Sequence, residues 1–145
     1  MIQIERHDHL TAEVHAIRRA VFMEEQGISE AEEFDGTDPG CTHWLLSEDG
    51  QASATLRTRI DGDTFKIGRV ATLATARGRG HAGRLLQAAI DAARQDGLAR
   101  VYLSAQMDVA PWYARFGFVT YGSVYDDAGI PHIDMELRLA PDAPQ

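Results

Sequence analysis

The sequence has few of the features that stabilise secreted proteins or anchor membrane proteins. Its only cysteine is Cys41, which excludes an intramolecular disulfide and predicts a reducing, cytoplasmic location. No apolar run approaches the roughly 20 residues that a membrane-spanning helix needs. The N-terminus, MIQIERHDHL, is too polar and acidic for a signal peptide. We therefore expect a cytoplasmic protein with no membrane partner.

Basic residues are scarce as well. The 145 residues include 14 Lys and Arg against 22 Asp and Glu, for a formal net charge of −8. Nucleic acid is therefore not an expected partner, because binding to a phosphate backbone depends on basic surface. Cysteine and histidine do not occur at the spacing of metal ligands, so no metal site is expected. The length is that of one domain spanning residues 1–145.

The most informative stretch lies in the middle of the chain, where a glycine- and arginine-rich segment separates two regular patterns. Apolar and β-compatible residues over Thr64–Thr72 predict a strand, and Leu and Ala at helical spacing after Arg84 predict a helix that ends at Asp96-Gly97. Between them lies RGRGHAG. Backbone N–H groups at a helix N-terminus have no partner within the helix and favour anions. The segment therefore predicts a phosphate or pyrophosphate site.

The distribution of charge favours an anion ligand over an ordinary solvated turn. Seven of the 14 basic residues fall between Arg57 and Arg84. The loop matches the G-x-G-x-x-G dinucleotide fingerprint, but the next strand ends in Ser104-Ala105-Gln106 without the acidic residue that would hold a ribose. The Gly-Lys-Ser/Thr ending of a nucleoside triphosphate loop is also missing. Binding of NAD or ATP is therefore a weaker alternative.

Short strands and helices alternate along the chain. Their order predicts an α/β fold with a mixed, mostly antiparallel central sheet and helices on both of its faces. The predicted strands are Ile2–Arg6, His43–Ser47, Gln51–Ile60, Thr64–Thr72, Ala99–Ser104, Phe118–Tyr125 and His132–Leu139. The predicted helices run from Thr11 to about Gln26, as a short turn over Glu30–Phe34, from Arg84 to Gln95, and over Val109–Phe116. The tail, Ala140–Gln145, is expected to be frayed.

The glycine-rich loop resembles the acetyl-coenzyme A (acetyl-CoA) loop of the GNAT superfamily of N-acetyltransferases. The segment RGRGHA, Arg77–Ala82, fits the pattern Arg/Gln-x-x-Gly-x-Gly/Ala position by position, and the predicted order of elements is also that of GNAT proteins. Within the superfamily, the sequence is similar to the ElaA-like branch. The matching words are AVFMEEQ at 20–26, DGTD at 35–38, IGRV at 67–70, AQ at 105–106 and GIPH at 129–132.

The resemblance implies how acetyl-CoA is held and which group acts as the general acid. The pantetheine arm is expected to bond to the strand backbone at Val70, Ala71 and Thr72. A tyrosine in the family's Tyr-x-x-x-Gly-Phe word commonly protonates the departing thiolate, and here it is Tyr113. The alternative reading of Tyr113 is a buried aromatic residue on an apolar helix face. The pyrophosphate is expected on the loop formed by Arg77, Gly78, Arg79, Gly80, His81, Ala82 and Gly83.

The general base is less defined. Glu25, at the end of the first helix, and His132, at the start of the last strand, are candidates for the base or the acceptor site, and His43 is a third. For each, the alternative is a surface charge or a hydrogen-bonded strand-end residue. Seven carboxylates between Glu24 and Asp38 indicate a cationic acceptor, with a solvated acidic loop as the alternative.

The resemblance thus implies an N-acetyltransferase that uses acetyl-CoA and acetylates a primary amine, by direct attack in a ternary complex. The acceptor is expected to be a small-molecule or peptide amine. A non-catalytic coenzyme A-binding module of the same fold is the alternative. Relatives are often homodimers, and the sequence leaves the oligomeric state open.

Arg69, amid small and apolar strand residues, predicts a structural ion pair with Glu25 or Asp35.

Overall fold

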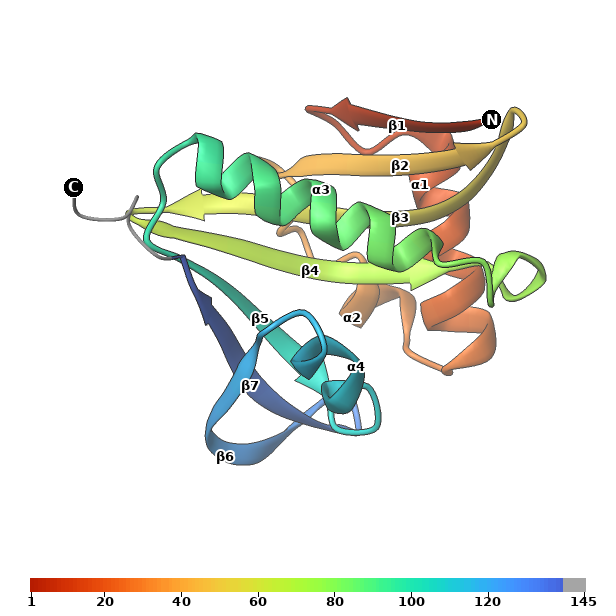
Figure 1. Cartoon of the computed structure of the whole chain (residues 1–145). Helices are drawn as coiled ribbons and strands as arrows, with labels where there is room; N and C mark the ends of the chain where they lie inside the picture. Colours follow the sequence, from red (N-terminus) through yellow and green to blue (C-terminus); the bar gives the residue numbers. More distant parts are fainter. Residues whose placement is uncertain (140–145) are drawn as a thin grey trace. The chain divides into compact units, whose positions relative to one another are not determined.

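Within the residues that the computed structural model describes, 1–139, seven strands form one sheet in the order β1-β2-β3-β4-β5-β7-β6 (Figure 1). β4 and β5 pair in parallel, whereas β1 with β2, β2 with β3, β5 with β7 and β6 with β7 pair antiparallel. The predicted mixed α/β fold is therefore confirmed. The strands are β1 (Ile2–His7), β2 (Thr42–Glu48), β3 (Gln51–Asp61), β4 (Thr64–Thr72), β5 (Arg100–Gln106), β6 (Val119–Asp127) and β7 (Ile130–Arg138).

The helices lie close to the predicted positions, with two differences at their ends and one additional turn. The central helix begins at His81 rather than Arg84, because the N–H of Arg84 already donates to the carbonyl of Gly80 at 3.1 Å. The helix predicted over Val109–Phe116 is shorter, and a 3-10 turn precedes the glycine-rich loop. The helical segments are α1 (Ala12–Arg18), η1 (Arg19–Glu25), α2 (Glu30–Glu33), η2 (Ala74–Ala76), α3 (His81–Gln95) and α4 (Ala110–Ala114). None of the helices over residues 1–139 is long and apolar enough to cross a membrane.

The first helical segment changes its winding halfway. Thr11 caps α1, since its side chain accepts a hydrogen bond from the N–H of Val14 at 3.2 Å. From Arg19 the helix continues as the π-helix η1, in which the N–H of Gln26 donates to the carbonyl of Val21 at 3.2 Å. The predicted helix to about Gln26 is thus confirmed, and its π-helical half is a feature that propensity does not reveal.

The chain divides into two compact units, both of which use part of β4 and part of α3. The first contains Met1–Arg59 and Gly68–Ala88, and the second contains Ile60–Ile67 and, among the described residues, 89–139. In the first unit, α1 and α3 cover opposite faces of the sheet (Figure 1). β2 is consequently buried on both faces, with four successive buried residues. One hydrophobic cluster of this unit is formed by Val14, Ile17, Val21, Phe22, Leu45 and Ala71.

In the second unit, β5 alternates buried and partly exposed residues. Val101, Leu103 and Ala105 are buried, while the residues between them lie on the other face of the strand. β6 and β7 complete this part of the sheet and meet at a turn in which Ala128 and Gly129 have positive φ angles of 54° and 81°. β7 therefore begins at Ile130, two residues earlier than predicted. The expectation for Ala140–Gln145 lies outside the described residues.

Candidate functional site

Strand β4 contains the backbone that is predicted to hold the pantetheine arm, and its conformation is irregular just before that point. Arg69 has a φ of 51°, a left-handed value that non-glycine residues seldom adopt inside a strand. Val70, Ala71 and Thr72 follow directly. A strained residue of this kind persists only where its surroundings hold it. The contacts of the Arg69 side chain supply that constraint.

The guanidinium of Arg69 is bound to the end of α2. Its Nε lies 3.1 Å from Glu33 Oε2, and its NH2 group lies 3.6 Å from Asp35 Oδ2. The same NH2 group donates to the backbone carbonyl of Glu33 at 3.0 Å. The predicted ion pair of Arg69 thus forms with Asp35 and more closely with Glu33. The alternative partner, Glu25, binds Arg77 instead.

Behind this contact lies a buried network of arginines and carboxylates. Arg18, with 1% of its surface exposed, donates to Glu33 Oε2 and to Asp38 Oδ1, each at 2.7 Å. Arg57 donates to the same oxygen of Asp38 at 2.9 Å. Burial raises the pKa of Glu33 above its usual value, although Arg69 and Arg18 oppose the shift. For Asp38, hydrogen bonds from Arg18 and Arg57 outweigh the effect of burial and lower its pKa.

His43 lies beside this network. Only 1% of its surface is exposed, and its Nε2 lies 3.9 Å from Asp38 Oδ1. Burial lowers the pKa of its imidazole despite the nearby carboxylate, so the ring is neutral near pH 7. His43 therefore lies buried beside this network, but neither of its ring nitrogens has a hydrogen-bond partner among residues 1–139, which differs from the alternative reading of a hydrogen-bonded strand-end residue. This arrangement does not support a role as the general base.

The glycine-rich loop is open at its two central glycines. Gly78 and Gly80 have φ angles of 81° and 76°, which favour glycine over any other residue. A Cβ atom built at either position would have no atom of the described residues within 4 Å. Helix α3 begins directly after Gly80, so the N–H groups of His81, Ala82 and Gly83 belong to its first turn. Backbone donors at a helix N-terminus thus adjoin free space, as an anion site requires.

The basic side chains of the loop are held by carboxylates from other elements. Arg77 forms a two-pronged contact with Glu25, with distances of 2.9 and 2.6 Å, and its Nε donates to the carbonyl of Thr72 at 3.1 Å. Arg79 and His81 both contact Glu48 Oε1, at 2.7 and 3.2 Å. The structure therefore brings Glu25, one of the candidate bases, against the predicted cofactor loop. Both of its oxygens are engaged there.

Tyr113, the predicted general acid, lies in α4 in the second unit. Only 7% of its surface is exposed, and its ring packs edge-on against Trp112 and Phe118, with centroid distances of 5.0 and 6.0 Å. This burial raises the pKa of its phenol far above the ordinary value of about 10. Tyr113 is therefore protonated near pH 7, the state that an acid needs.

His132, in the same unit, has a defined tautomer. Its Nδ1 lies 2.8 Å from the carbonyl oxygen of Ile130, which can only accept a hydrogen bond. Nδ1 therefore bears the proton, and in the neutral ring Nε2 presents a lone pair. The strand register places His132 opposite Gln106 on β5 and Tyr125 on β6. This geometry is compatible with a general base.

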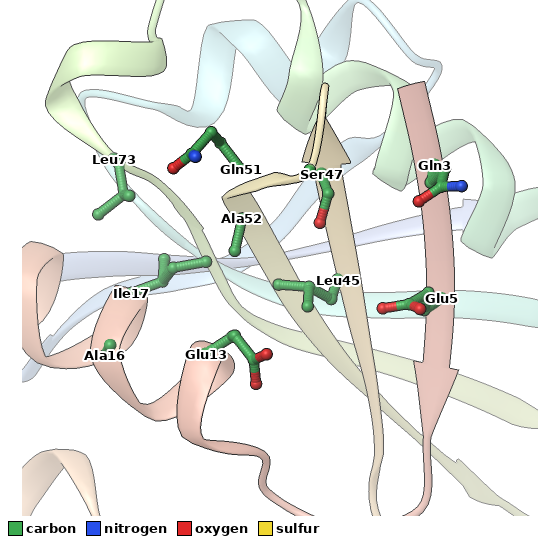
Figure 2. A pocket seen from close by; sticks show the side chains of 11 residues that line it. Gln3, Glu5, Glu13, Ala16, Ile17, Leu45, Ser47, Gln51, Ala52 and Leu73 are labelled. Carbon is green, nitrogen blue, oxygen red and sulfur yellow. The ribbon is translucent and has the colours of Figure 1, made fainter. Parts of the chain in front are cut away.

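The first unit also contains a cavity of about 530 Å³ between α1 and the strands β1 to β3 (Figure 2). Ile17, Leu45 and Ala52 form an apolar floor, and the carboxylates of Glu5 and Glu13 extend into the space from β1 and α1. Its volume is within the range of small-molecule pockets. None of the predicted site residues lines it. Sequence reasoning missed this cavity because its walls come from four separate elements.

Among residues 1–139, no three His, Cys, Asp or Glu side chains gather in a way that could hold a metal ion. The predicted site residues fall in both units. Val70 to Thr72, the loop from Arg77 to Gly83 and Glu25 lie in the first. Tyr113 and His132 lie in the second.

Comparison with known proteins gives a consistent result. A family described as the acetyltransferase (GNAT) domain matches residues 8–139. The uncharacterized protein YyaT of Bacillus subtilis is 34% identical over 127 residues, which cover 86% of each chain. The crystal structure of an acyl-CoA N-acyltransferase from Pseudomonas aeruginosa is 34% identical, with a TM-score of 0.82, and the match covers 94% of this chain and 99% of that one. Escherichia coli ElaA is 28% identical with a TM-score of 0.80 and the same coverage.

Proposed function

Because this chain belongs to the GNAT acetyltransferase family, we propose that it transfers the acetyl group of acetyl-CoA to a primary amine, by direct attack in a ternary complex. The observation that carries the proposal is the open loop at Gly78 and Gly80, which leads from β4 into the N-terminus of α3. Free space, backbone donors and the helix dipole there suit a pyrophosphate. The similarity to an acyl-CoA N-acyltransferase supports the same cofactor.

In this proposal the backbone of β4 and the glycine-rich loop bind the cofactor. The pantetheine arm bonds to the backbone of Val70, Ala71 and Thr72, and one of the backbone N–H groups there faces the thioester oxygen. The salt bridges of Arg77 with Glu25 and of Arg79 with Glu48 keep two guanidinium groups at the edge of the pyrophosphate loop. The buried network around Glu33 holds β4 in its irregular conformation through Arg69.

The proton transfers are assigned to Tyr113 and His132. The amine nitrogen attacks the thioester carbon, the carbon–sulfur bond breaks, and the sulfur leaves as a thiolate. Tyr113 gives its proton to this thiolate. The amine loses one proton, and Nε2 of His132 accepts it. Glu25 is the weaker candidate for the base, since both of its oxygens are bound by Arg77.

A thermal-shift titration with acetyl-CoA, coenzyme A, NADH and ATP in parallel tests the cofactor assignment. A ligand at 100 times its Kd stabilises the native state by about 2.7 kcal/mol, which raises Tm by roughly 5–10 °C for a chain of this size. We expect this rise with acetyl-CoA and coenzyme A alone. A rise with NADH or ATP alone, or with none of the four, contradicts the proposal.

Release of free thiol from acetyl-CoA in the presence of amines then separates the enzyme from a binding module. Turnover that depends on the amine supports the transferase. Binding of coenzyme A without thiol release from any amine leaves the non-catalytic module as the better description.

A further inference from the structure

One face of the strands β5, β6 and β7 carries a connected group of polar and aromatic side chains. Residues at alternate positions of a strand share a face, so Tyr102 and Ser104 of β5 lie with Asp134 and His132 of β7. The register pairs Ser104 with Asp134 directly. Tyr125 of β6 lies opposite His132 and joins the same face. All of these residues belong to the second unit.

Asp134 is the centre of this group. Its Oδ1 atom accepts a hydrogen bond from the hydroxyl of Tyr102 at 2.6 Å and another from Tyr125 at 2.8 Å. Tyr125 also bonds with the hydroxyl of Ser104, and Ser104 must be the donor because the single phenolic proton of Tyr125 is already committed. Burial and the adjacent carboxylate raise the pKa of Tyr102, so its phenol is a neutral donor near pH 7.

Two cations lie near the ring of Tyr102, with Lys66 Nζ 5.9 Å and the Arg100 guanidinium 5.8 Å from its centroid, and both are paired with other carboxylates. Arg100 donates to Glu136 at 2.7 Å, and Lys66 lies 3.1 Å from Asp61. Among residues 1–139, Asp134 forms no ion pair with an arginine or lysine, and the two hydrogen bonds on its Oδ1 atom come from the phenols of Tyr102 and Tyr125. Both of these bonds end on Oδ1, and the second carboxylate oxygen has lone pairs of its own. A charged carboxylate beside two aromatic rings suits an ammonium ion.

The spacing of His132 and Asp134 limits the length of a ligand that can contact both side chains. Two residues on one face of a strand are separated by about 7 Å. The ring of Tyr125 spans this interval, since its centroid lies 6.1 Å from that of His132 while its hydroxyl bonds to Asp134. A molecule that contacts both His132 and Asp134 must therefore have two nitrogens that are separated by a short aliphatic chain. About four methylene groups bridge this distance.

We propose that Asp134, together with Tyr102 and Tyr125, binds the second, non-reacting ammonium group of a short aliphatic diamine, while His132 accepts a proton from the first. This inference rests on the proposed acetyltransferase function and names the acceptor class of that site. The reacting amine is acetylated as described above, and the Asp134-bound nitrogen keeps its proton and charge throughout.

The experiment compares 1,4-diaminobutane with 1-aminobutane, which has the same carbon chain and one amine. Calorimetry measures the binding of each amine, and thiol release from acetyl-CoA measures transfer. The wild-type chain is expected to bind and acetylate the diamine at least tenfold better. Asp134→Asn removes the charge but retains a hydrogen-bond acceptor for both phenols. It should raise the Kd and KM of the diamine by about 10- to 100-fold, with little effect on 1-aminobutane.

Two further variants separate this role from a structural one. Asp127→Asn removes a carboxylate from the β6–β7 hairpin outside the group and should leave both amines unaffected. Tyr125→Phe retains the ring and removes the hydroxyl, so it should weaken diamine binding less than Asp134→Asn does. Unchanged melting temperatures with acetyl-CoA verify that the variants are folded and bind the cofactor.

The outcomes distinguish this inference from the proposed function. Equal affinity of the wild type for both amines, or an equal loss for both in Asp134→Asn, overturns the diamine site even when thiol release is observed. Absence of thiol release with every amine overturns the transferase. A diamine preference in calorimetry that depends on Asp134 would then still support the cation site.

Discussion

Two tyrosines of this chain illustrate how one side-chain type serves different chemistry in different surroundings. Tyr113 is buried among Trp112 and Phe118, where the charged form of the phenol is strongly disfavoured. Tyr125 is partly exposed and donates to Asp134. An acid that protonates a thiolate must retain its proton until the carbon–sulfur bond breaks. The surroundings of Tyr113 meet that requirement.

Replacing Tyr113 by Phe tests its role. We expect kcat for thiol release to fall by about 100-fold, within the 10²–10⁴ range of general acid catalysis. The midpoint of thermal unfolding with acetyl-CoA should still rise, because the ring that packs in the core is retained. Tyr121→Phe, on the exposed strand β6, is the matched control and should keep the wild-type rate. Normal turnover by Tyr113→Phe would exclude it as the acid.

The two candidate bases can be separated in the same assay. His132→Gln should lower kcat by about 100-fold, because it removes the lone pair that Nε2 presents. Glu25→Gln should change kcat by only a few-fold, since both oxygens of its carboxylate are already bound by Arg77. The reverse pattern would assign the base to Glu25.

At the scale of an element, the loop between β4 and α3 depends on two backbone positions. Gly78 and Gly80 adopt left-handed conformations in which any side chain is strained, by about 1–2 kcal/mol for each residue. The same positions adjoin the free space that the cofactor is proposed to fill. A methyl group there would thus affect both the shape of the loop and the approach of the pyrophosphate.

A matched pair of glycine variants separates these two effects. Gly80→Ala should destabilise the chain by about 1 kcal/mol and weaken acetyl-CoA binding about tenfold or more. Gly62→Ala, in the turn between β3 and β4, has a φ of 62° and equally open surroundings, so it should have a similar cost in stability. It should leave the Kd for acetyl-CoA unchanged. If both variants bind acetyl-CoA as the wild type does, the loop is not the pyrophosphate site.

At the scale of the whole molecule, the buried network around Asp38 links stability to pH. Its pKa is lowered in the folded state below the ordinary 3.8, so its ionisation stabilises the fold at every pH above that value. This contribution is lost as the pH falls through the folded pKa, below about 4. Glu33 has a raised pKa and acts in the opposite direction, since burial favours its protonated form.

Urea unfolding between pH 7 and pH 3 measures this linkage. Asp38→Asn should lower the free energy of unfolding at pH 7 by about 1–3 kcal/mol, the usual contribution of hydrogen bonds to a charged group. Its stability should also decline less steeply below pH 4 than that of the wild type. Asp108→Asn, at an exposed position, should match the wild type at both ends of the range. Parallel curves for Asp38→Asn and the wild type would contradict the assignment.

The local features of the chain were predictable because neighbouring residues determine them. Thr11 caps the first helix, glycines at 78 and 80 fit the loop, and alternation in β5 separates a buried face from a polar one. Each of these depends on sterics or hydrogen bonds within a few residues. The order of such elements, together with the loop, was sufficient to indicate the GNAT family. The positive φ of Arg69 and the π-helical winding of η1 could not be predicted, because contacts from distant elements maintain them.

By itself, then, the sequence determined the elements, their order and the position of the glycine-rich loop, since these follow from local conformational preferences, and its motifs indicated the family. Only the tertiary structure decided which charges meet. Glu25 contacts Arg77 across 52 positions of the chain, and Asp134 meets two tyrosines from two other strands. Composition cannot specify such pairs. A basic or phenolic side chain could bind any of several carboxylates in the sequence, and strand register and helix packing decide which of them lies within reach. The side chains that we propose to bind the acceptor are brought together by that register.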